Sequence, residues 1–177
     1  MKRAIDIGVA AGALLVAAPL LAVLAVAVRA TMGAPVLFRQ RRAGKAGRPF
    51  TLLKLRTMRT GATGEPDAAR LTRLGAWLRA WSFDELPQLW NVLRGEMSLV
   101  GPRPLPVRPE AFVGEERRRL EVRPGLTGLW QVSGRSELSW DESIELDLRY
   151  VDGWSHGLDL AILARTPLAV ARGRGAF

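Results

Sequence analysis

The chain has 177 residues, enough for about one domain with a substantial buried core. The absence of cysteine and the presence of a single histidine, His156, argue against disulfides, zinc centres and serine-histidine triads, so any catalytic metal should be a hard cation on oxygen ligands, Mg²⁺ first. The formal net charge of +9 indicates an anionic partner: nucleic acid, anionic lipid or a phosphorylated substrate.

The first predicted element is a membrane helix. Ile7 to Val28 contains 22 residues without a charge, and a straight helix of that length would reach roughly 33 Å, enough to cross a bilayer. Lys2 and Arg3 precede this run and several arginines follow it, so both flanks carry the positive charge typical of the cytoplasmic side. The position of these apolar residues also argues against nucleic acid as the partner.

Pro19 lies near the middle of this run and should kink the helix. A kinked helix that enters one leaflet and returns would place both basic flanks on one side, so we predict a re-entrant helix. A plain transmembrane helix and a signal peptide cleaved after Ala25-Val26-Ala27 are the alternatives, although the apolar run exceeds the usual signal core of about 7 to 15 residues.

Residues 35–58 predict two short strands joined by a Gly-rich basic turn, a β-hairpin. Lys54 and Arg56 are two residues apart and should share a face of the second strand. The basic residues of the hairpin could meet anionic headgroups or form a solvated surface, and they are Arg39, Arg41, Arg42, Lys45 and Arg48.

A polar loop over 60–67 is followed by a predicted helix over 68–81. Its Trp77 and Trp81 fit either a membrane interface or the core.

The segment from Ser82 to Pro106 carries the strongest chemical signal. Asp84 and Glu85 precede a short apolar helix that ends at Arg94-Gly95, and the helix begins either with a Ser82/Glu85 capping box or at Pro87. At a helix start, the dipole favours an ionised carboxylate that can attack or hold a cation, although capping alone is the simpler reading of the pair. Arg103 follows between two prolines and is suited to a planar anion.

The remaining chain predicts a charged, solvated segment over 108–121 and then a Gly/Pro-rich loop over 122–135. The loop could present backbone N–H groups and two arginines to a phosphate. A helix over 140–151 should carry Trp140, Ile144, Leu148 and Val151 on one face, with Asp147 structural. A last helix over 158–171, capped by Ser155, suits a membrane surface or a lid on the core.

The run from Asp84 to Pro104, DELPQLWNVLRGEMSLVGPRP, resembles the signature of the bacterial sugar transferases, the small monotopic polyprenyl-phosphate phosphoglycosyl transferases. Residues 49–58 resemble the family's Pro-Phe-x-x-x-Lys-x-Arg-[Ser/Thr]-Met motif, and residues 124–135 resemble its second signature. The family is also built around a proline-broken membrane helix. Its frequent Ser before that proline is replaced here by Ala18.

The resemblance implies transfer of a sugar-1-phosphate from a nucleotide-diphosphate sugar, usually a UDP-sugar, to undecaprenyl phosphate. Asp84 would be the nucleophile and a Mg²⁺ ligand, and Glu85 a second catalytic residue, as proton acceptor or metal ligand. The expected substrate-binding residues are Lys54, Arg56, Arg79, Arg103, Arg123, Gln131 and Arg135.

We therefore expect an α+β protein. Residues 1–30 would form the re-entrant membrane helix, and residues 31–177 a small catalytic domain of helices with a short β-hairpin and an interfacial amphipathic helix, on the cytoplasmic face of the bacterial inner membrane. The expected partners are polyprenyl phosphate, membrane lipid and a nucleotide-diphosphate sugar. A non-catalytic basic membrane adaptor and a nucleotide-sugar phosphohydrolase are the rival functions.

Overall fold

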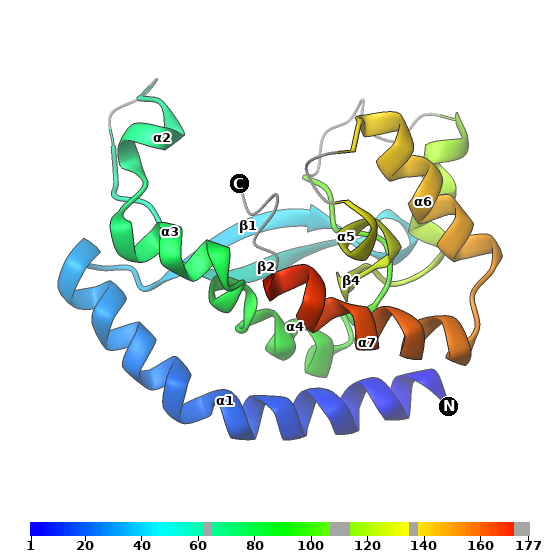
Figure 1. Ribbon diagram of the computed structural model, residues 1–177, viewed down its shortest axis with the longest axis horizontal. Coiled ribbons are helices and arrows are strands. Elements are labelled where there is room, and N and C mark those ends of the chain that lie inside the picture. The colour runs from blue at the N-terminus through cyan, green and yellow to red at the C-terminus, as the bar shows by residue number, and fades with distance from the viewer. Residues whose placement is uncertain (62–64, 107–113, 135–137, 172–177) are drawn as a thin grey trace.

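The computed structural model describes residues 1–61, 65–106, 114–134 and 138–171. Its mixed helices and small sheets confirm the predicted α+β class. Figure 1 shows the long helix α1 (Lys2–Met32) along one side, α4 (Gln88–Arg94) and α7 (His156–Ala171) lying against it, and the hairpin of β1 (Leu37–Ala43) and β2 (Pro49–Leu55) above them. The arrangement places the hairpin on the side of α4 opposite to α1.

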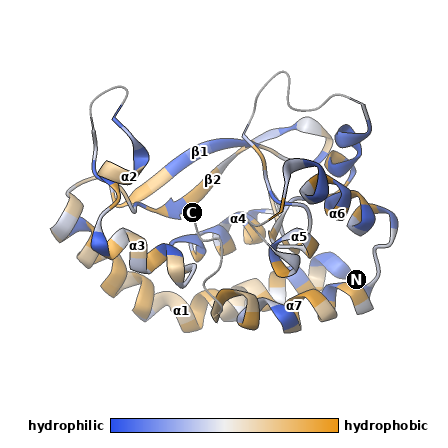
Figure 2. Ribbon diagram, turned by 45° about the horizontal axis from the view of Figure 1, so that its top comes forward, coloured by the Kyte–Doolittle hydropathy of each residue, from blue (hydrophilic) through white to orange (hydrophobic). Residues whose placement is uncertain are grey.

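Helix α1 runs without a break through Pro19 and is bent (Figure 1). It is long and apolar enough to cross a membrane, and most of its apolar window is exposed, as are Leu15 and Val16. Its length extends the predicted boundary at residue 30 by two residues, and the re-entrant topology stays a prediction. Figure 2 shows that α1 and α7 are the most hydrophobic helices of the molecule.

Both ends of α1 contact the rest of the protein. In its second turn, the buried carboxylate of Asp6 accepts hydrogen bonds from Ser98 Oγ and Leu99 N, at 2.8 and 3.1 Å. Near its other end, Leu24 and Val28 pack in a cluster with Leu55 and Leu78. Helix α1 is therefore fixed along the domain at two places.

The predicted hairpin is confirmed. Strands β1 and β2 pair antiparallel from Leu37 opposite Leu55 to Ala43 opposite Pro49, and a short 3-10 turn, η1 (Lys45–Gly47), joins them. Residues opposite each other share a face of the hairpin, as do residues two apart.

The helix predicted over 68–81 is wrong as a single element. The structure has α2 (Asp67–Arg70) and α3 (Arg73–Ala80), separated at Leu71 and Thr72. Thr72 is extended, and its side chain accepts a hydrogen bond from Gly75 N, so it starts a new helix. Its backbone N–H also donates to Thr57 O, which holds this break against the end of β2.

The centre of the molecule combines α4, β3 (Ser98–Val100) and β4 (Gly125–Thr127), the last two paired in parallel. The predicted glycine at the end of α4 is confirmed, since Gly95 adopts a left-handed conformation with φ 81°. The buried core around these elements contains Leu89, Val92, Met97, Leu99, Val100, Tyr150 and Ile162.

The C-terminal part contains η3 (Gly114–Glu121), α5 (Leu129–Ser133) and α6 (Trp140–Asp152). The solvated face predicted for the charged segment is wrong at Arg119, which is buried and forms an ion pair with buried Asp147. The apolar face predicted for α6 is not the buried one, because the structure buries Ser143, Ile144, Asp147 and Tyr150 and leaves Trp140 exposed. Ser155 Oγ accepts from Leu158 N, which confirms the predicted cap of α7.

Candidate active site

Asp84 and Glu85 lie in a 3-10 turn, η2 (Phe83–Glu85), just before α4. The Ser82/Glu85 capping box is wrong: Ser82 is left-handed, with φ 55°, and its side chain forms no capping bond. The helix begins at Gln88, with Pro87 as the preceding cap residue, one residue later than the predicted start at Pro87. The two carboxylates therefore lie on a separate turn, which presents them to the hairpin.

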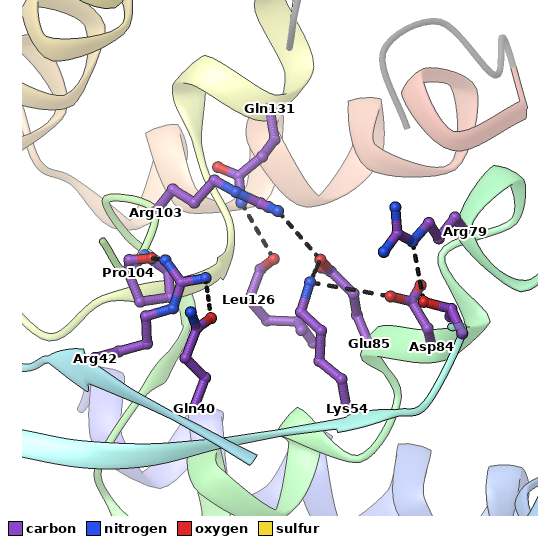
Figure 3. Close-up of polar contacts among 11 residues, drawn as sticks. Gln40, Arg42, Lys54, Arg79, Asp84, Glu85, Arg103, Pro104, Leu126 and Gln131 are labelled. Atoms are coloured by element: carbon purple, nitrogen blue, oxygen red, sulfur yellow. Dashed lines mark hydrogen bonds and ion pairs between the residues drawn. The ribbon is translucent and has the colours of Figure 1, made fainter. Parts of the chain in front are cut away.

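Glu85 is the centre of an ion-pair cluster (Figure 3). Its Oε1 accepts hydrogen bonds from Lys54 Nζ at 2.6 Å and from Arg103 Nη2 at 3.3 Å. Burial alone would raise the pKa of Glu85, but the charges and hydrogen bonds of Arg103 and Lys54 outweigh it and hold the pKa at about 2. Glu85 is thus a permanent anion that orients two cations.

Asp84 has a different environment from its neighbour. It is 6% exposed, and its only ion pair among the described residues is the longer one to Lys54 Nζ, at 3.9 Å. Burial, assisted by the negative charge of Glu85, raises the pKa of Asp84 to about 6, against the opposing charges of Lys54, Arg79 and Arg103. Desolvation thus outweighs the favourable effect expected of a helix start on the pKa of Asp84, although a pKa of about 6 still leaves the carboxylate ionised at neutral pH.

Arg79 reaches the site from the end of α3. Its Nε donates to Thr57 Oγ1 at 3.1 Å, and Figure 3 shows its guanidinium beside Asp84. This placement agrees with the position expected for Arg79 next to the carboxylates.

Arg103 lies on the segment after β3, where the backbone is tightly packed. Gly101 N donates to Thr127 O, and Gly125 N donates to Pro102 O. A Cβ on Gly101 would lie 2.4 Å from Arg123 O, so the close approach requires glycine. The Arg103 guanidinium also lies 5.9 Å from the ring centroid of Trp130. Neighbouring backbone and an aromatic face thus restrict the cation that faces Glu85.

The hairpin and α4 are joined by a side chain that the sequence analysis did not single out. Asn91 is fully buried on α4; its Oδ1 accepts from Leu53 N at 3.1 Å, and its Nδ2 donates to Thr51 O at 2.7 Å. These bonds tie α4 to β2 and so set the distance between Glu85, on the turn η2 just before α4, and Lys54 on β2.

Arg42 is a second residue that the sequence analysis missed as a site residue. It shares the hairpin face of Gln40 and Lys54, and it donates to Pro104 O at 3.1 Å and to Gln40 Oε1 at 2.5 Å. Burial, followed by the charge of Arg103, lowers the pKa of Arg42 to about 10. The strand alternation places it in phase with Lys54, whereas Arg41 points to the other face and is exposed.

The other predicted substrate-binding residues are more dispersed. Arg56 is buried and donates to the carbonyls of Met32, Gly33 and Ala34, so the structure places it at the end of α1 and not among the carboxylates. Strand β2 ends at Leu55, so the expected alternation no longer holds at Arg56.

In the second signature, Arg123 Nε donates to Gly95 O at 2.9 Å from an exposed position. Gln131 Nε2 donates to Leu126 O at 3.3 Å, near Arg103 (Figure 3). Arg135 lies outside the described residues.

The protein side chains of this site could supply only one or two ligands to a metal ion. Within the described ranges, no group of three or more His, Cys, Asp or Glu side chains could hold a metal ion. Mg²⁺ commonly binds through one or two carboxylates together with substrate phosphates and water. Asp84 fits that role, since Glu85 Oε1 already accepts from Lys54 and Arg103.

Comparison with known proteins defines the chain further. A sequence profile described as "Bacterial sugar transferase" matches residues 1–173. The chain is 45% identical over 183 aligned residues to UDP-glucose:undecaprenyl-phosphate glucose-1-phosphate transferase of Caulobacter vibrioides, covering 93% of this chain and 67% of that protein. It is 49% identical over 144 residues to an uncharacterized sugar transferase, EpsL, of Bacillus subtilis, covering 78% and 71% of the two chains.

A third relative matches over nearly its whole length. The exopolysaccharide production protein ExoY of Rhizobium meliloti is 39% identical over 199 aligned residues, covering 99% of this chain and 88% of ExoY. The cationic carboxylate site and these matches define the class of protein as a phosphoglycosyl transferase. The chain belongs to the bacterial sugar transferase family.

Proposed function

We propose that the chain transfers a sugar-1-phosphate from a UDP-sugar to undecaprenyl phosphate through a covalent intermediate on Asp84. The observation that carries this proposal is the contrast between two adjacent carboxylates at one cationic site. Glu85 is neutralised by Lys54 and Arg103, while Asp84 is desolvated and only loosely paired. A desolvated, weakly paired carboxylate is suited to attack, because ionic partners that would make it unreactive are directed to its neighbour.

The chemistry divides into two displacements. An oxygen of Asp84 attacks the sugar-bearing phosphorus, the bond from that phosphorus to the bridging oxygen breaks, and the electron pair leaves with the nucleoside monophosphate. An oxygen of the lipid phosphate then attacks the same phosphorus, and the Asp84 carboxylate is released. No proton acceptor is needed for a carboxylate nucleophile, in agreement with a chain that has one histidine and no cysteine.

Four cations can stabilise the charge on the transferred phosphoryl group. Lys54, Arg79 and Arg103 lower the pKa of Asp84 by their charge, so each is close enough to act on an anion there. Arg42 adds a fourth charge beside Arg103. Mg²⁺, held by Asp84 and the substrate phosphates, would neutralise the diphosphate and favour departure of the nucleotide.

Membrane placement of the site follows from α1. Both of its ends contact one domain, which supports a helix that dips into one leaflet rather than one that separates its ends across a bilayer. We place the protein at the cytoplasmic face of the bacterial inner membrane, where a nucleotide sugar and a lipid phosphate can meet. Exposed Leu160 and Leu168 make α7 the proposed interfacial helix.

The relatives' names indicate glucose or galactose donors and exopolysaccharide synthesis as the first candidates.

The decisive experiment uses full-length protein, Mg²⁺, undecaprenyl phosphate and a panel of radiolabelled UDP-sugars. We expect an organic-extractable product with one or more donors, and no product from Asp84→Asn. Asp141→Asn, which changes an exposed aspartate on α6, is the matched control and should keep full activity.

Intact-protein mass spectrometry with donor alone tests the intermediate. A phosphosugar adduct on wild type and its absence from Asp84→Asn are expected. Lipid product without any such adduct would contradict the covalent route. Consumption of UDP-sugar without a lipid product would indicate the rival phosphohydrolase.

A further inference from the structure

A cavity of about 390 Å³ lies at the far end of α1, lined by residues outside the carboxylate site. This volume is in the range of small-ligand sites, roughly 300 to 1,000 Å³. Three of the lining residues are arginines, and none of those described is acidic; the lining consists of Thr31, Arg59, Ala69, Arg70, Leu71, Thr72, Arg73 and Leu74. Such a lining selects an anion.

Backbone contacts hold together the two segments that carry Arg59 and Arg70. Arg59 N donates to Arg70 O at 2.9 Å, and the flanking residues Met58 and Leu71 form an isolated β-bridge. Arg73 is the first residue of α3, so the N-terminal turn of that helix, with its partial positive charge, also lines the cavity.

Arg70 has hydrogen-bonding capacity left over. Its Nη2 donates to Asp67 Oδ1 at 2.6 Å, and Asp67 itself is mostly exposed. Its Nε is buried, whereas its Nη1 is not buried and has no hydrogen-bond partner among the described residues. A planar guanidinium with a free, accessible donor is suited to the oxygens of a phosphate.

The location identifies the source of the phosphate. Thr31 belongs to the last turn of α1, the helix that is apolar enough for a membrane, and Thr72 Oγ1 contacts Met32 Sδ at 3.6 Å. Trp77 and Trp81, farther along the same α3 segment, are exposed, and exposed tryptophans are typical of the membrane-water boundary. A cationic cavity at the end of a membrane helix therefore lies at the depth of lipid headgroups.

We propose that this cavity binds the phosphate of an anionic phospholipid headgroup and thereby fixes the end of α1 and the start of α3 at the membrane surface. The site is separate from the chemistry at Asp84 and does not depend on it. Its ligand is a phosphodiester held by Arg59, Arg70 and Arg73.

The test is native mass spectrometry of the full-length protein in detergent with added phosphatidylglycerol or phosphatidylcholine. Wild type should retain phosphatidylglycerol preferentially, and Arg70→Gln/Arg73→Gln should retain at least tenfold less. Arg117→Gln/Arg149→Gln removes the same charge from exposed positions on η3 and α6 and should bind as wild type does. The single variant Arg73→Gln, at an exposed position, should give an intermediate loss.

Further measurements separate the remaining outcomes. Transferase activity of Arg70→Gln/Arg73→Gln in detergent without phosphatidylglycerol should stay within twofold of wild type. Equal retention of phosphatidylglycerol by the cavity variant and the control variant would overturn the assignment. A second pair of results would also overturn it: millimolar inorganic phosphate displaces the bound lipid, and the protein retains phosphatidylcholine as well as phosphatidylglycerol. The site would then recognise free phosphate and not an anionic lipid.

Discussion

Asp84 and Glu85 are neighbours in the sequence, and their different surroundings give them different tasks. Glu85 has a pKa of about 2 because two cations bond to it, whereas burial raises the pKa of Asp84 to about 6. At neutral pH both are anions, but only Asp84 accepts a proton readily. This separation of pKa values distinguishes a reactive carboxylate from one that orients cations.

The pH dependence of adduct formation tests this separation. The rate of phosphosugar labelling of Asp84 with donor alone should be level above pH 7 and fall about tenfold per unit well below pH 6, because only the ionised carboxylate attacks. The pKa of Asp84 is about 6 in the folded state and 3.8 ordinarily, so the folded state binds this proton more tightly. The contribution of Asp84 to the free energy of unfolding therefore rises as the pH falls from 6 towards 3.8. A rate that is unchanged down to pH 4.5 would contradict the assignment.

Arg42 provides a test of the site residue that the hairpin register places beside Arg103. Arg42→Gln should lower kcat/KM for the UDP-sugar by roughly 10- to 100-fold, since a half-buried charge that meets the diphosphate is lost. Arg41→Gln removes a charge from the exposed, opposite face of β1 and should change kcat/KM by less than twofold. Equal effects of the two substitutions would show that Arg42 acts only through the net positive charge of the surface and not as a site residue.

At the scale of elements, the docking of α4 on β2 determines the geometry of the site. Asn91→Ala would remove a fully buried amide that bonds Leu53 N, Thr51 O and Glu96 Oε2. Because these bonds are partly buried, we expect a loss of about 1 to 3 kcal/mol of stability and a lower kcat. Thermal unfolding in detergent measures the first effect. Arg94→Ala, at an exposed position of the same helix, should be close to neutral, and a similar loss there would contradict the role of Asn91.

Local patterns predicted much of this arrangement. The hairpin, the glycine end of α4 and the capped last helix follow from turn residues and periodicity, and Asp84, Glu85 and Arg103 were recognised from one contiguous motif. Arg42 was missed because its role depends on which hairpin face is covered, which is a tertiary property. Arg56 was grouped with Lys54 because the alternation gave no sign that β2 ends at Leu55. The burial of Arg119 depends on Asp147, 28 positions away.

At the scale of the whole molecule, the contacts at both ends of α1 predict its topology. The chain has no cysteine, so single cysteines can be introduced cleanly. Ala4→Cys and Thr60→Cys, on either side of the apolar run, should both be inaccessible to a membrane-impermeant maleimide in intact cells with a permeabilised outer membrane. Both should react after the inner membrane is opened. Labelling of only one position in intact cells would show that α1 spans the membrane.

The hydrogen bonds of Asp6 make α1 more than a detachable tether. Its carboxylate supplies acceptors to Ser98 and Leu99, and the strand that contains them leads directly to Gly101 and Arg103. A soluble version made by trimming the first helix would expose Leu89 and Val92 and leave two polar groups of that strand without their acceptor. Engineers who want a water-soluble catalyst must therefore keep the first two turns, which include Asp6, and change only the lipid-facing side chains.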